Sequence, residues 1–355
     1  MSTPDAPHAG GTARAAGKPF PASSPVGSPA LDLQDLRVDF PTPLGEVGIV
    51  DGVSLSIARG EALGMVGESG SGKTMIALAC LRMVPEPGRV AATRLRVADR
   101  DLLALDEPAL CAVRGADVGV VFQNPMTAFN PVRTIGEQLA ATWLRLRPAG
   151  GARPSRREAR ERAIAALREV GIAAPERRVD AYPHQMSGGM LQRALIAHAM
   201  INQPALIVAD EPTTALDATV QAQILDLLRA RLANAGLLLV THDLGVAAEI
   251  CDRVAVVYAG RVVEVGPARE LLESPRHPYT QALLAAAPRL DPERRPLAPI
   301  PGAPPSPADL VAGCRYAPRC PRAVPRCGER PRLAPEGPHA YACWNPADDA
   351  RRAKP

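Results

Sequence analysis

The sequence predicts an α/β protein with a parallel central sheet and a phosphate-binding loop. The first observation is the segment GESGSGKT at residues 67–74, which follows a short apolar run at 62–66. The second is a set of further short apolar runs without alternation, which are typical of strands buried on both faces. Helical stretches separate the last three runs, and this favours parallel strands joined by crossovers. The further runs cover residues 118–122, 206–209, 237–240 and 254–257.

Two segments with alternating apolar residues precede the phosphate loop, at 31–40 and 47–57. Alternation of this kind predicts antiparallel strands. The residues before them are rich in Ala, Pro, Gly and Ser and show no apolar period. We therefore expect residues 1–30 to be a disordered leader.

The segment 67–74 matches the pattern G-x-x-x-x-G-K-[ST] of loops that bind nucleotide phosphates. Its glycines let the backbone turn sharply towards one anion, and the following helix adds its N-terminal dipole. Lys73 is one of only three lysines among 41 basic residues, which suits a site for a compact point charge. We expect Lys73 to reach the β- and γ-phosphates and Thr74 to bind Mg²⁺. The predicted ligands of the nucleotide here are Gly67, Glu68, Ser69, Gly70, Ser71, Gly72, Lys73 and Thr74.

The middle and the end of the chain differ from this α/β pattern. Residues 125–202 are mainly helical in character, so we expect an inserted helical subdomain within a main domain at 31–265. An extension at 266–347 and a tail at 348–355 should follow. From Pro288 onward the chain holds 16 of its 38 prolines, which predicts little regular structure there.

Composition and charge limit the class of protein. No apolar run approaches the ~18 residues needed to cross a bilayer, and the N-terminus lacks the layout of a signal peptide. Residues 311–355 carry nine Arg or Lys and four Asp or Glu, which is a net charge of +5. The whole chain has a net charge of +4, so the residues before 311 have a net charge of −1. The main body therefore has no basic stripe for nucleic acid. From the lack of an apolar span and of a signal-peptide layout we expect a cytoplasmic chain.

Polar residues follow three of the predicted parallel strands. Asp210 and Glu211 follow one strand, Gln123 follows another, and His242 lies just beyond a third. The carboxyl ends of parallel strands lie at one edge of a sheet, where α/β proteins bind ligands. A carboxylate beside a phosphate loop can hold Mg²⁺, and a second can orient a water. We expect these four residues to converge on one γ-phosphate.

The segment MSGGMLQR at 186–193 places Ser-Gly-Gly at the start of an apolar helix, with Ser187 as the expected N-cap. A helix that begins in this way offers a second site for an anion. With this segment, the order of motifs closely resembles the ATP-binding subunit of an ABC transporter, over residues 31–345. Met186 stands where Leu is commoner in the family's signature motif, which is a volume-conserving change.

The resemblance implies a RecA-like P-loop NTPase core with an antiparallel β subdomain, an inserted α-helical subdomain and a Cys-rich C-terminal extension. It implies a site shared by two subunits. ATP would lie between the Walker A loop of one subunit and the signature residues of the other, which are Ser187, Gly188 and Gly189.

The resemblance also assigns catalytic roles. Glu211 would polarise the attacking water, His242 would contact the γ-phosphate, and Gln123 would report the position of metal and water to the permease. The other implied ligands are Thr74, Gln123 and Asp210 for Mg²⁺, Phe40 for stacking on adenine, and Asp217 of the D-loop for the nucleotide.

Narrower motifs resemble oligopeptide and dipeptide importers, a group that includes nickel and some glutathione importers. The motifs lie at residues 123–131, 182–185, 211–217 and 277–284. They imply ATP-driven import through two separate permease subunits, with a second, different ATP-binding subunit in a heterodimer. An extracytoplasmic solute-binding protein would act indirectly. The chain would lie at the cytoplasmic face of the cell membrane as a peripheral protein.

Two other functions are alternatives to ATP-driven import. ABC-type ATPases that act on nucleic acid, in repair or translation, usually carry two cassettes or long coiled-coil arms. This chain has one phosphate loop and no sustained heptads, so we expect no nucleic acid partner. A non-enzymatic nucleotide sensor is disfavoured by the presence of both Glu211 and His242. The transported solute is not encoded in this sequence.

Four of the seven cysteines lie in the extension. Their spacing is wider than in common structural zinc sites, and a cytoplasmic chain should not hold disulfides. In the family that the sequence resembles, this tail carries a [4Fe–4S] cluster, for which four thiolates are suitable ligands. The alternative is a set of reduced, unligated thiols in a segment with little order of its own. The implied cluster ligands are Cys314, Cys320, Cys327 and Cys343.

Overall fold

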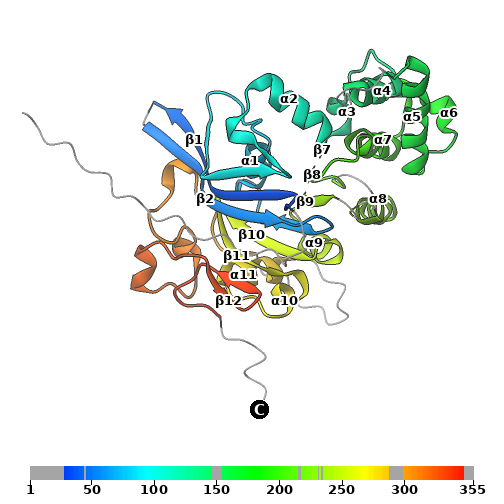
Figure 1. Ribbon diagram of the computed structural model, residues 1–355. Helices are drawn as coiled ribbons and strands as arrows, with labels where there is room; N and C mark the ends of the chain where they lie inside the picture. The colour runs from blue at the N-terminus through cyan, green and yellow to red at the C-terminus, as the bar shows by residue number, and fades with distance from the viewer. Residues whose placement is uncertain are drawn as a thin grey trace, which may run out of the picture.

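A computed structural model of the protein describes residues 28–43, 45–145, 154–214, 217–230, 232, 235–287 and 299–347. Two sheets lie at the centre of this described part, with helices around them (Figure 1). Most of the expected leader at 1–30 and all of the tail at 348–355 lie outside the described residues, as do Ala215 and Leu216 of the D-loop. No helix in the described ranges is long and apolar enough to cross a membrane.

The larger sheet contains every strand predicted from the short apolar runs. Its strands are β3 (Ala62–Val66), β7 (Val118–Val121), β8 (Leu206–Asp210), β9 (Gly236–Val240), β10 (Arg253–Tyr258), β11 (Arg261–Pro267), β12 (Ala334–Glu336) and β13 (His339–Tyr341). Their order is β12-β13-β11-β10-β3-β9-β8-β7 among the described residues. The strands from β10 to β7 are parallel, and the other three join antiparallel at one edge. The predicted parallel α/β sheet is confirmed.

The smaller sheet is antiparallel and packs on one face of the larger sheet. Its strands are β1 (Leu31–Thr42), β2 (Gly45–Ile57), β4 (Arg89–Ala91), β5 (Arg94–Val97) and β6 (Arg100–Asp101). β1 pairs antiparallel with β2, which confirms the strand pair expected before the phosphate loop. The sequence does not predict β4, β5 and β6, because each has at most four residues and shows no sustained pattern.

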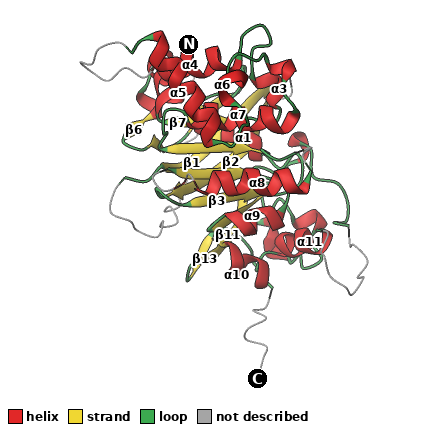
Figure 2. Ribbon diagram, turned by 90° about the vertical axis from the view of Figure 1, so that its right-hand side faces the viewer, coloured by secondary structure: helices red, strands yellow, loops and turns green. Residues whose placement is uncertain are grey.

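Two groups of helices lie beyond the strands at opposite ends of the view in Figure 2, and α8 and α9 lie between these groups. Helices α3–α7 lie at one end, and α10 and α11 at the other. The described residues between 125 and 202 are mainly helical, in agreement with the helical character predicted for this segment. The helices are α1 (Lys73–Cys80), α2 (Glu107–Ala116), α3 (Pro125–Ala128), α4 (Ile135–Arg145), α5 (Arg156–Glu169), α6 (Pro175–Arg178), α7 (Gly188–Met200), α8 (Ala218–Ala230), α9 (Leu244–Ile250), α10 (Ala268–Glu273) and α11 (Pro278–Ala286).

The parallel strands are buried on both faces, which explains why their sequences do not alternate. Ala62 and Val66 of β3 belong to the apolar cluster shared with the helices, whereas Leu63 and Met65 belong to the cluster beneath the smaller sheet. Successive side chains of a strand point to opposite faces, so each face of the larger sheet has its own core. The phosphate loop therefore leaves a strand that packing holds from both sides.

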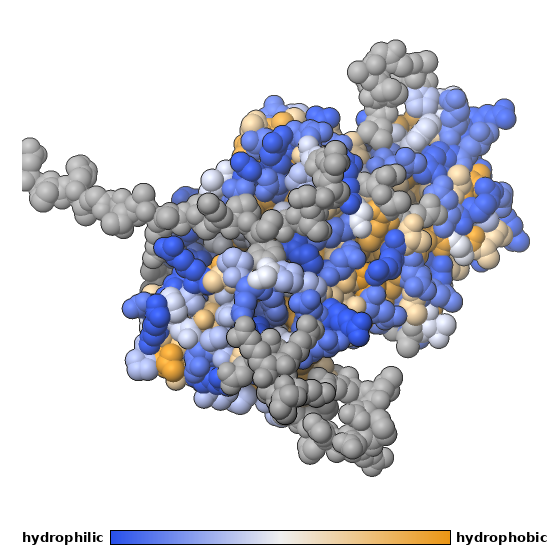
Figure 3. Space-filling model, turned by 60° about the horizontal axis from the view of Figure 1, so that its bottom comes forward, coloured by the Kyte–Doolittle hydropathy of each residue, from blue (hydrophilic) through white to orange (hydrophobic). Residues whose placement is uncertain are grey.

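Regular structure is sparse after residue 299, as the prolines predict. The described part of this region contains β12, β13 and the short 3₁₀ turns Pro307–Asp309, Ala317–Arg319 and Pro325–Gly328. β13 pairs with β11, so this region adds strands to the edge of the larger sheet. Figure 3 shows a largely hydrophilic surface, with apolar side chains gathered on the right, where Figure 1 places α4–α8.

Candidate functional site

The phosphate loop connects β3 to α1, and close contacts shape its backbone. A side chain on Gly67 would place its Cβ 2.2 Å from the carbonyl oxygen of Val257. Gly72 has φ of 99° and is the N-cap of α1, a conformation that favours glycine. Ser69 and Gly70 are exposed. The loop and the helix start that follows it therefore have the form of a phosphate cradle.

Lys73 begins α1 and is buried beneath the loop, with 6% of its surface exposed. Its Nζ donates to the carbonyl oxygens of Gly67 at 2.8 Å and of Glu68 at 2.9 Å. Burial lowers the pKa of Lys73, whereas the charges of Glu211, Asp210 and Glu68 act to raise it. An anionic phosphate oxygen is a stronger partner for an ammonium than a neutral carbonyl. Lys73 can therefore exchange these loop contacts for nucleotide.

Asp210 and Thr74 form a pair of oxygen ligands next to the loop. The Thr74 hydroxyl donates to Asp210 Oδ1 at 3.2 Å. Burial raises the pKa of Asp210, the Thr74 hydrogen bond lowers it, and the charge of Glu211 raises it again. Mg²⁺ prefers hard oxygen ligands and binds through one or two carboxylates plus phosphate oxygens. The two residues fit such an ion in chemical type.

Glu211 lies at the centre of a hydrogen-bonded group at the carboxyl ends of the strands. Gln123 Nε2 donates to its Oε2 at 2.8 Å, and His242 Nδ1 lies 3.2 Å from its Oε1. The Thr214 hydroxyl also donates to Oε2, at 3.0 Å. The backbone of Glu211 has φ of 46°, which is uncommon for a residue other than glycine. The structure thus brings Gln123, Glu211 and His242 together, and it adds Thr214, for which the sequence predicts no role.

The signature residues lie at the start of α7. Ser187 accepts a hydrogen bond from the N–H of Met190 at 3.3 Å, so it is the N-cap that its sequence position predicts. Ser187 and Gly188 are exposed, and Gly189 is half-buried. None of the hydrogen bonds or ion pairs of the described residues joins these three positions to the phosphate loop of the same chain.

Two further predicted ligands are Asp217, at the start of α8, and Phe40, on β1. Asp217 accepts a hydrogen bond from the N–H of Val220 at 2.9 Å, at the start of α8. Phe40 is half-buried on β1, where a Cβ on Gly88 would lie 2.6 Å from its ring. Within the described ranges, no hydrogen bond or ring contact joins either residue to the phosphate loop.

Comparison with known proteins decides the family. Residues 50–214 match the family described as ABC transporter, and residues 263–327 match the oligopeptide/dipeptide transporter C-terminal region. A putative peptide import ATP-binding protein of Brucella melitensis is 47% identical over 313 residues, which cover 84% of this chain and 91% of that protein. The chain belongs to the oligopeptide/dipeptide group of ABC transporter ATP-binding proteins. The family predicted from the motifs is confirmed.

Further relatives and a solved structure agree with this family. The dipeptide transport ATP-binding protein DppD of Escherichia coli is 44% identical, with 91% of this chain and 98% of that protein covered. The oligopeptide transport ATP-binding protein OppD of Mycobacterium bovis is 48% identical over 84% of this chain, which spans about half (49%) of that relative's length. The dimeric ATP-binding cassette MJ0796, bound to ADP and Pi after hydrolysis, is 30% identical with a TM-score of 0.58 and covers 67% of this chain and 99% of its own. The ABC cassette fold is therefore shown.

The four cysteines of this ABC protein's extension lie near one another. The N–H of Cys314 donates to the carbonyl oxygen of Cys327 at 2.9 Å. Burial, followed by the charges of Cys314, Cys320 and Cys327, raises the pKa of Cys343 to about 11. Thiolates are suitable ligands for an iron–sulfur cluster. Among the described residues, however, no group of three or more Cys, His, Asp or Glu side chains has the arrangement of metal ligands. The geometry adds no support to the predicted cluster.

The structure also shows contacts to the phosphate loop that the motifs do not indicate. The carboxylate of Glu68 pairs with Arg319 at 2.7 Å, and the N–H of Glu68 donates to the hydroxyl of Tyr279 at 2.8 Å. Both partners follow residue 265 in the chain. Tyr279 lies within the motif at 277–284, but that motif indicates the transporter group and not a contact.

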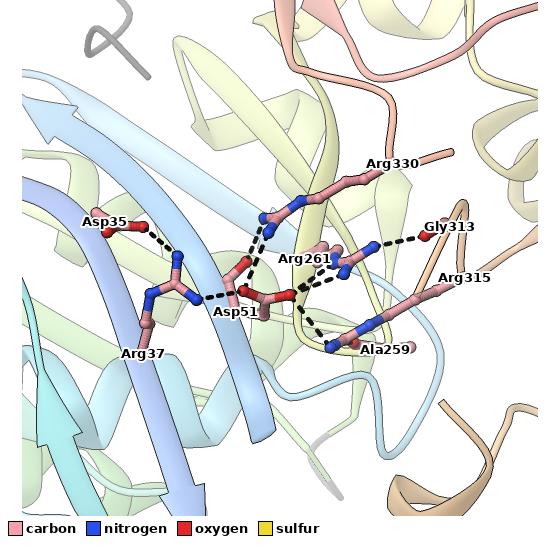
Figure 4. Close-up of polar contacts among 8 residues, drawn as sticks. All are labelled: Asp35, Arg37, Asp51, Ala259, Arg261, Gly313, Arg315 and Arg330. Carbon is pink, nitrogen blue, oxygen red and sulfur yellow. Dashed lines mark hydrogen bonds and ion pairs between the residues drawn. The ribbon is translucent and has the colours of Figure 1, made fainter. Parts of the chain in front are cut away.

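A half-buried carboxylate with several arginines lies nearby, and we call it the Asp51 cluster (Figure 4). Asp51 pairs with Arg261 at 2.8 Å, Arg37 at 3.0 Å, Arg330 at 3.1 Å and Arg315 at 3.4 Å. Burial alone would raise the pKa of Asp51, but the hydrogen bond from Arg261 and the nearby arginine charges lower it to about 2. The cluster therefore joins the smaller sheet, β11 and the extension through one carboxylate.

Proposed function

We propose that this ABC protein is the ATP-hydrolysing subunit of an importer for peptides or related small solutes. The observation that carries the proposal is the convergence of Gln123 and His242 on Glu211, directly after Asp210, which bonds to Thr74 of the phosphate loop. The solute class rests on the relatives, which are named for transport of oligopeptides and dipeptides. The nucleic-acid alternative gains no support from the matched C-terminal family, which is that of a transporter.

Nucleotide binding is proposed to occur on the loop at 67–74. Lys73 would exchange its carbonyl acceptors for the β- and γ-phosphate oxygens of ATP. Thr74, Asp210 and Gln123 would hold Mg²⁺, which offsets phosphate charge when bound. Phe40 is proposed to stack on the adenine ring.

Glu211 is the proposed group that polarises the attacking water. Gln123 and Thr214 both donate to one oxygen of its carboxylate, which fixes the orientation of the group. The other oxygen faces His242, whose side chain is 62% exposed and free to turn towards a γ-phosphate. Oriented hydrogen bonds of this kind reduce the cost of placing water for attack in line with the phosphate.

The complete site is proposed to need a second subunit. The exposed residues Ser187 and Gly188, with Gly189, have an N-terminal helix position suited to phosphate but do not bond to their own phosphate loop. They would therefore contact ATP held by a partner, as would Asp217. The similar MJ0796 cassette is described as dimeric.

The assembly is proposed to follow the group that the sequence resembles. A different ATP-binding subunit would complete a heterodimer, two permease subunits would form the membrane part, and a solute-binding protein would act from outside. The chain would then lie at the cytoplasmic face of the membrane. The main domain would span 31–265, with the helical subdomain at 125–202 and the extension at 266–347.

Glu211→Gln, in the complex purified from its native membranes, tests the proposal. We expect ATP binding to persist and turnover to fall by about 10²–10⁴-fold, because the carboxylate that orients water is lost. Glu161→Gln is the matched control, since Glu161 is an exposed residue of α5 that pairs with Arg157. Near-normal hydrolysis by Glu211→Gln would remove Glu211 from this role. Recovery of two permease chains and a second ATP-binding subunit supports the importer, and recovery of nucleic acid contradicts it.

The [4Fe–4S] cluster predicted for Cys314, Cys320, Cys327 and Cys343 rests on the family resemblance alone. Anaerobically purified protein is expected to contain iron and to absorb broadly at about 400 nm, and Cys327→Ser should lose both signals. Protein without iron in this preparation would favour reduced, unligated thiols.

A further inference from the structure

On the basis of the proposed ATPase function, we propose that Arg319 of the C-terminal extension is a positioning residue for ATP. Its guanidinium holds and neutralises Glu68, the second residue of the phosphate loop. Arg319 thereby allows the loop to present a cation and N–H groups to the phosphates without an opposing carboxylate charge. It acts through Glu68 and not by touching the nucleotide.

The Arg319–Glu68 pair is a two-point contact between residues 251 positions apart. Nη1 lies 2.7 Å from Oε2, and Nη2 lies 3.0 Å from Oε1. The side chain of Arg319 is 7% exposed. It also donates to the carbonyl oxygens of Pro301 and Gly302 and to the hydroxyl of Tyr258. The guanidinium is therefore fixed by its own surroundings, and its planar fork matches the Glu68 carboxylate.

The backbone of Glu68 is held from the same side. Its N–H donates to the hydroxyl of Tyr279 at 2.8 Å. The rings of Tyr258, Tyr279 and Tyr316 pack together with centroids 4.6, 5.1 and 5.2 Å apart, and each is at most 1% exposed. These are three of the five tyrosines in the chain. A close-packed aromatic cluster of this kind has a defined geometry, so it gives Glu68 a rigid support.

The extension also supports the other end of the loop, indirectly, through the turn between β10 and β11 at Gly260. The N–H of Gly260 donates to the carbonyl oxygen of Ser71 at 2.7 Å, and its carbonyl accepts from the N–H of Asp51 at 3.0 Å. Arg315 pairs with Asp51 and donates to the carbonyl that precedes Gly260 (Figure 4). Arg319 therefore holds one side of the phosphate loop directly, and Arg315 supports the other side through the turn at Gly260.

The charge of Glu68 is the reason that the loop needs Arg319. The carbonyl oxygen of Glu68 accepts from Lys73 Nζ, and the Glu68 carboxylate is among the charges that act on Lys73. Without a counter-ion, that carboxylate would compete for the Lys73 ammonium and repel an anionic nucleotide. With Arg319 in place the Glu68 pair is neutral, and the positive charge of Lys73 remains available to phosphate.

Binding of labelled ATP to the full-length chain tests the inference. Arg319→Ala is expected to weaken binding about tenfold, the loss typical of one buried charged hydrogen-bonded pair. The loss should be larger at low ionic strength, because the carboxylate is then less screened. Adding Glu68→Gln to Arg319→Ala should restore affinity to within about threefold of the wild type, since the repelling charge is gone. General loosening of the extension would not be repaired by this second substitution.

Two further variants complete the test. Arg319→Lys keeps the charge but loses the fork, so we expect a loss of about threefold. Arg322→Ala is the matched control, because Arg322 lies in the same extension and donates to the carbonyl of Pro346 at 3.0 Å; its affinity should equal that of the wild type. Wild-type protein that binds no ATP would refute the proposed function itself. Wild-type binding together with normal affinity in Arg319→Ala, or with no rescue by Glu68→Gln, would overturn only the role of Arg319.

Discussion

The phosphate loop is flanked by two regions that differ in exposure and in strength of contact. In the strand-end group of Gln123, Glu211 and His242, the outer side chain of His242 is 62% exposed and the central side chain of Glu211 is 20% exposed. The rear contacts, which are the Glu68–Arg319 pair and the Asp51 cluster, are formed by arginines whose side chains are 7–32% exposed. Residues that must exchange partners during hydrolysis need freedom, whereas residues that hold the loop need fixed partners. The comparison predicts that changes at the strand ends alter turnover and changes at the rear alter affinity or stability.

Asp51→Asn should have the largest effect on stability. It leaves four arginines without their shared carboxylate, and removing one partner of a buried ionic group costs about 3–5 kcal/mol. Urea denaturation measures the change in the free energy of unfolding. Asp32→Asn is the control, because the Arg94 partner of Asp32 is 50% exposed and such a pair contributes less than about 1 kcal/mol. Equal, small losses in both variants would mean that the rear cluster behaves like an ordinary surface pair.

The Asp51 cluster should also make stability depend on acid pH. The folded-state pKa of Asp51, about 2, lies below its ordinary value of 3.8. The stabilisation is therefore fully present above about pH 4 and is lost as the pH falls through about 2, with a total near 2 kcal/mol. Unfolding measured between these values should show this dependence in the wild type and lack it in Asp51→Asn. Identical acid profiles would remove Asp51 as its source.

Thr214→Val should have the smallest effect and should appear only in turnover. It removes the donor 3.0 Å from Glu211 Oε2 at nearly constant shape, while Gln123 still bonds to the same oxygen. A single hydrogen bond contributes about 0.5–1.5 kcal/mol, which corresponds to a roughly threefold to tenfold loss of turnover. Equilibrium binding of ATP should not change. Weaker binding with normal turnover would place Thr214 with the rear contacts instead.

The strand-end group could be predicted because each of its residues belongs to a local pattern. Gln123 and Asp210 follow short apolar runs directly and Glu211 comes next to Asp210, and parallel strands bring such positions to one edge. Arg319 could not be predicted in the same way. Its pair with Glu68 spans 251 residues, and it lies in a Pro-rich segment without periodicity. One arginine among 41 basic residues carries no signal of its partner.

The strands also fall into those that the sequence predicts and those that it does not, for the same physical reason. β3 and β8 could be placed because burial on both faces makes them continuous apolar runs. β12 and β13 have three residues each, and they exist as strands because β13 pairs with β11. Tertiary pairing of this kind leaves no local pattern. The attachment of the extension to the main sheet, on which the position of Arg319 depends, therefore emerges only from the structure.

ATP affinity and turnover, measured for Glu211→Gln and Arg319→Ala in the same assembled complex, test the difference between the two regions most directly. We expect Glu211→Gln to lose at least about 100-fold in turnover and to keep its affinity for ATP. We expect Arg319→Ala to bind ATP about tenfold more weakly and to turn over at a near-normal rate when saturated. Two results would contradict the separate roles of the strand-end group and the rear contacts. One is normal affinity with reduced turnover in Arg319→Ala, and the other is weak binding with normal turnover in Glu211→Gln.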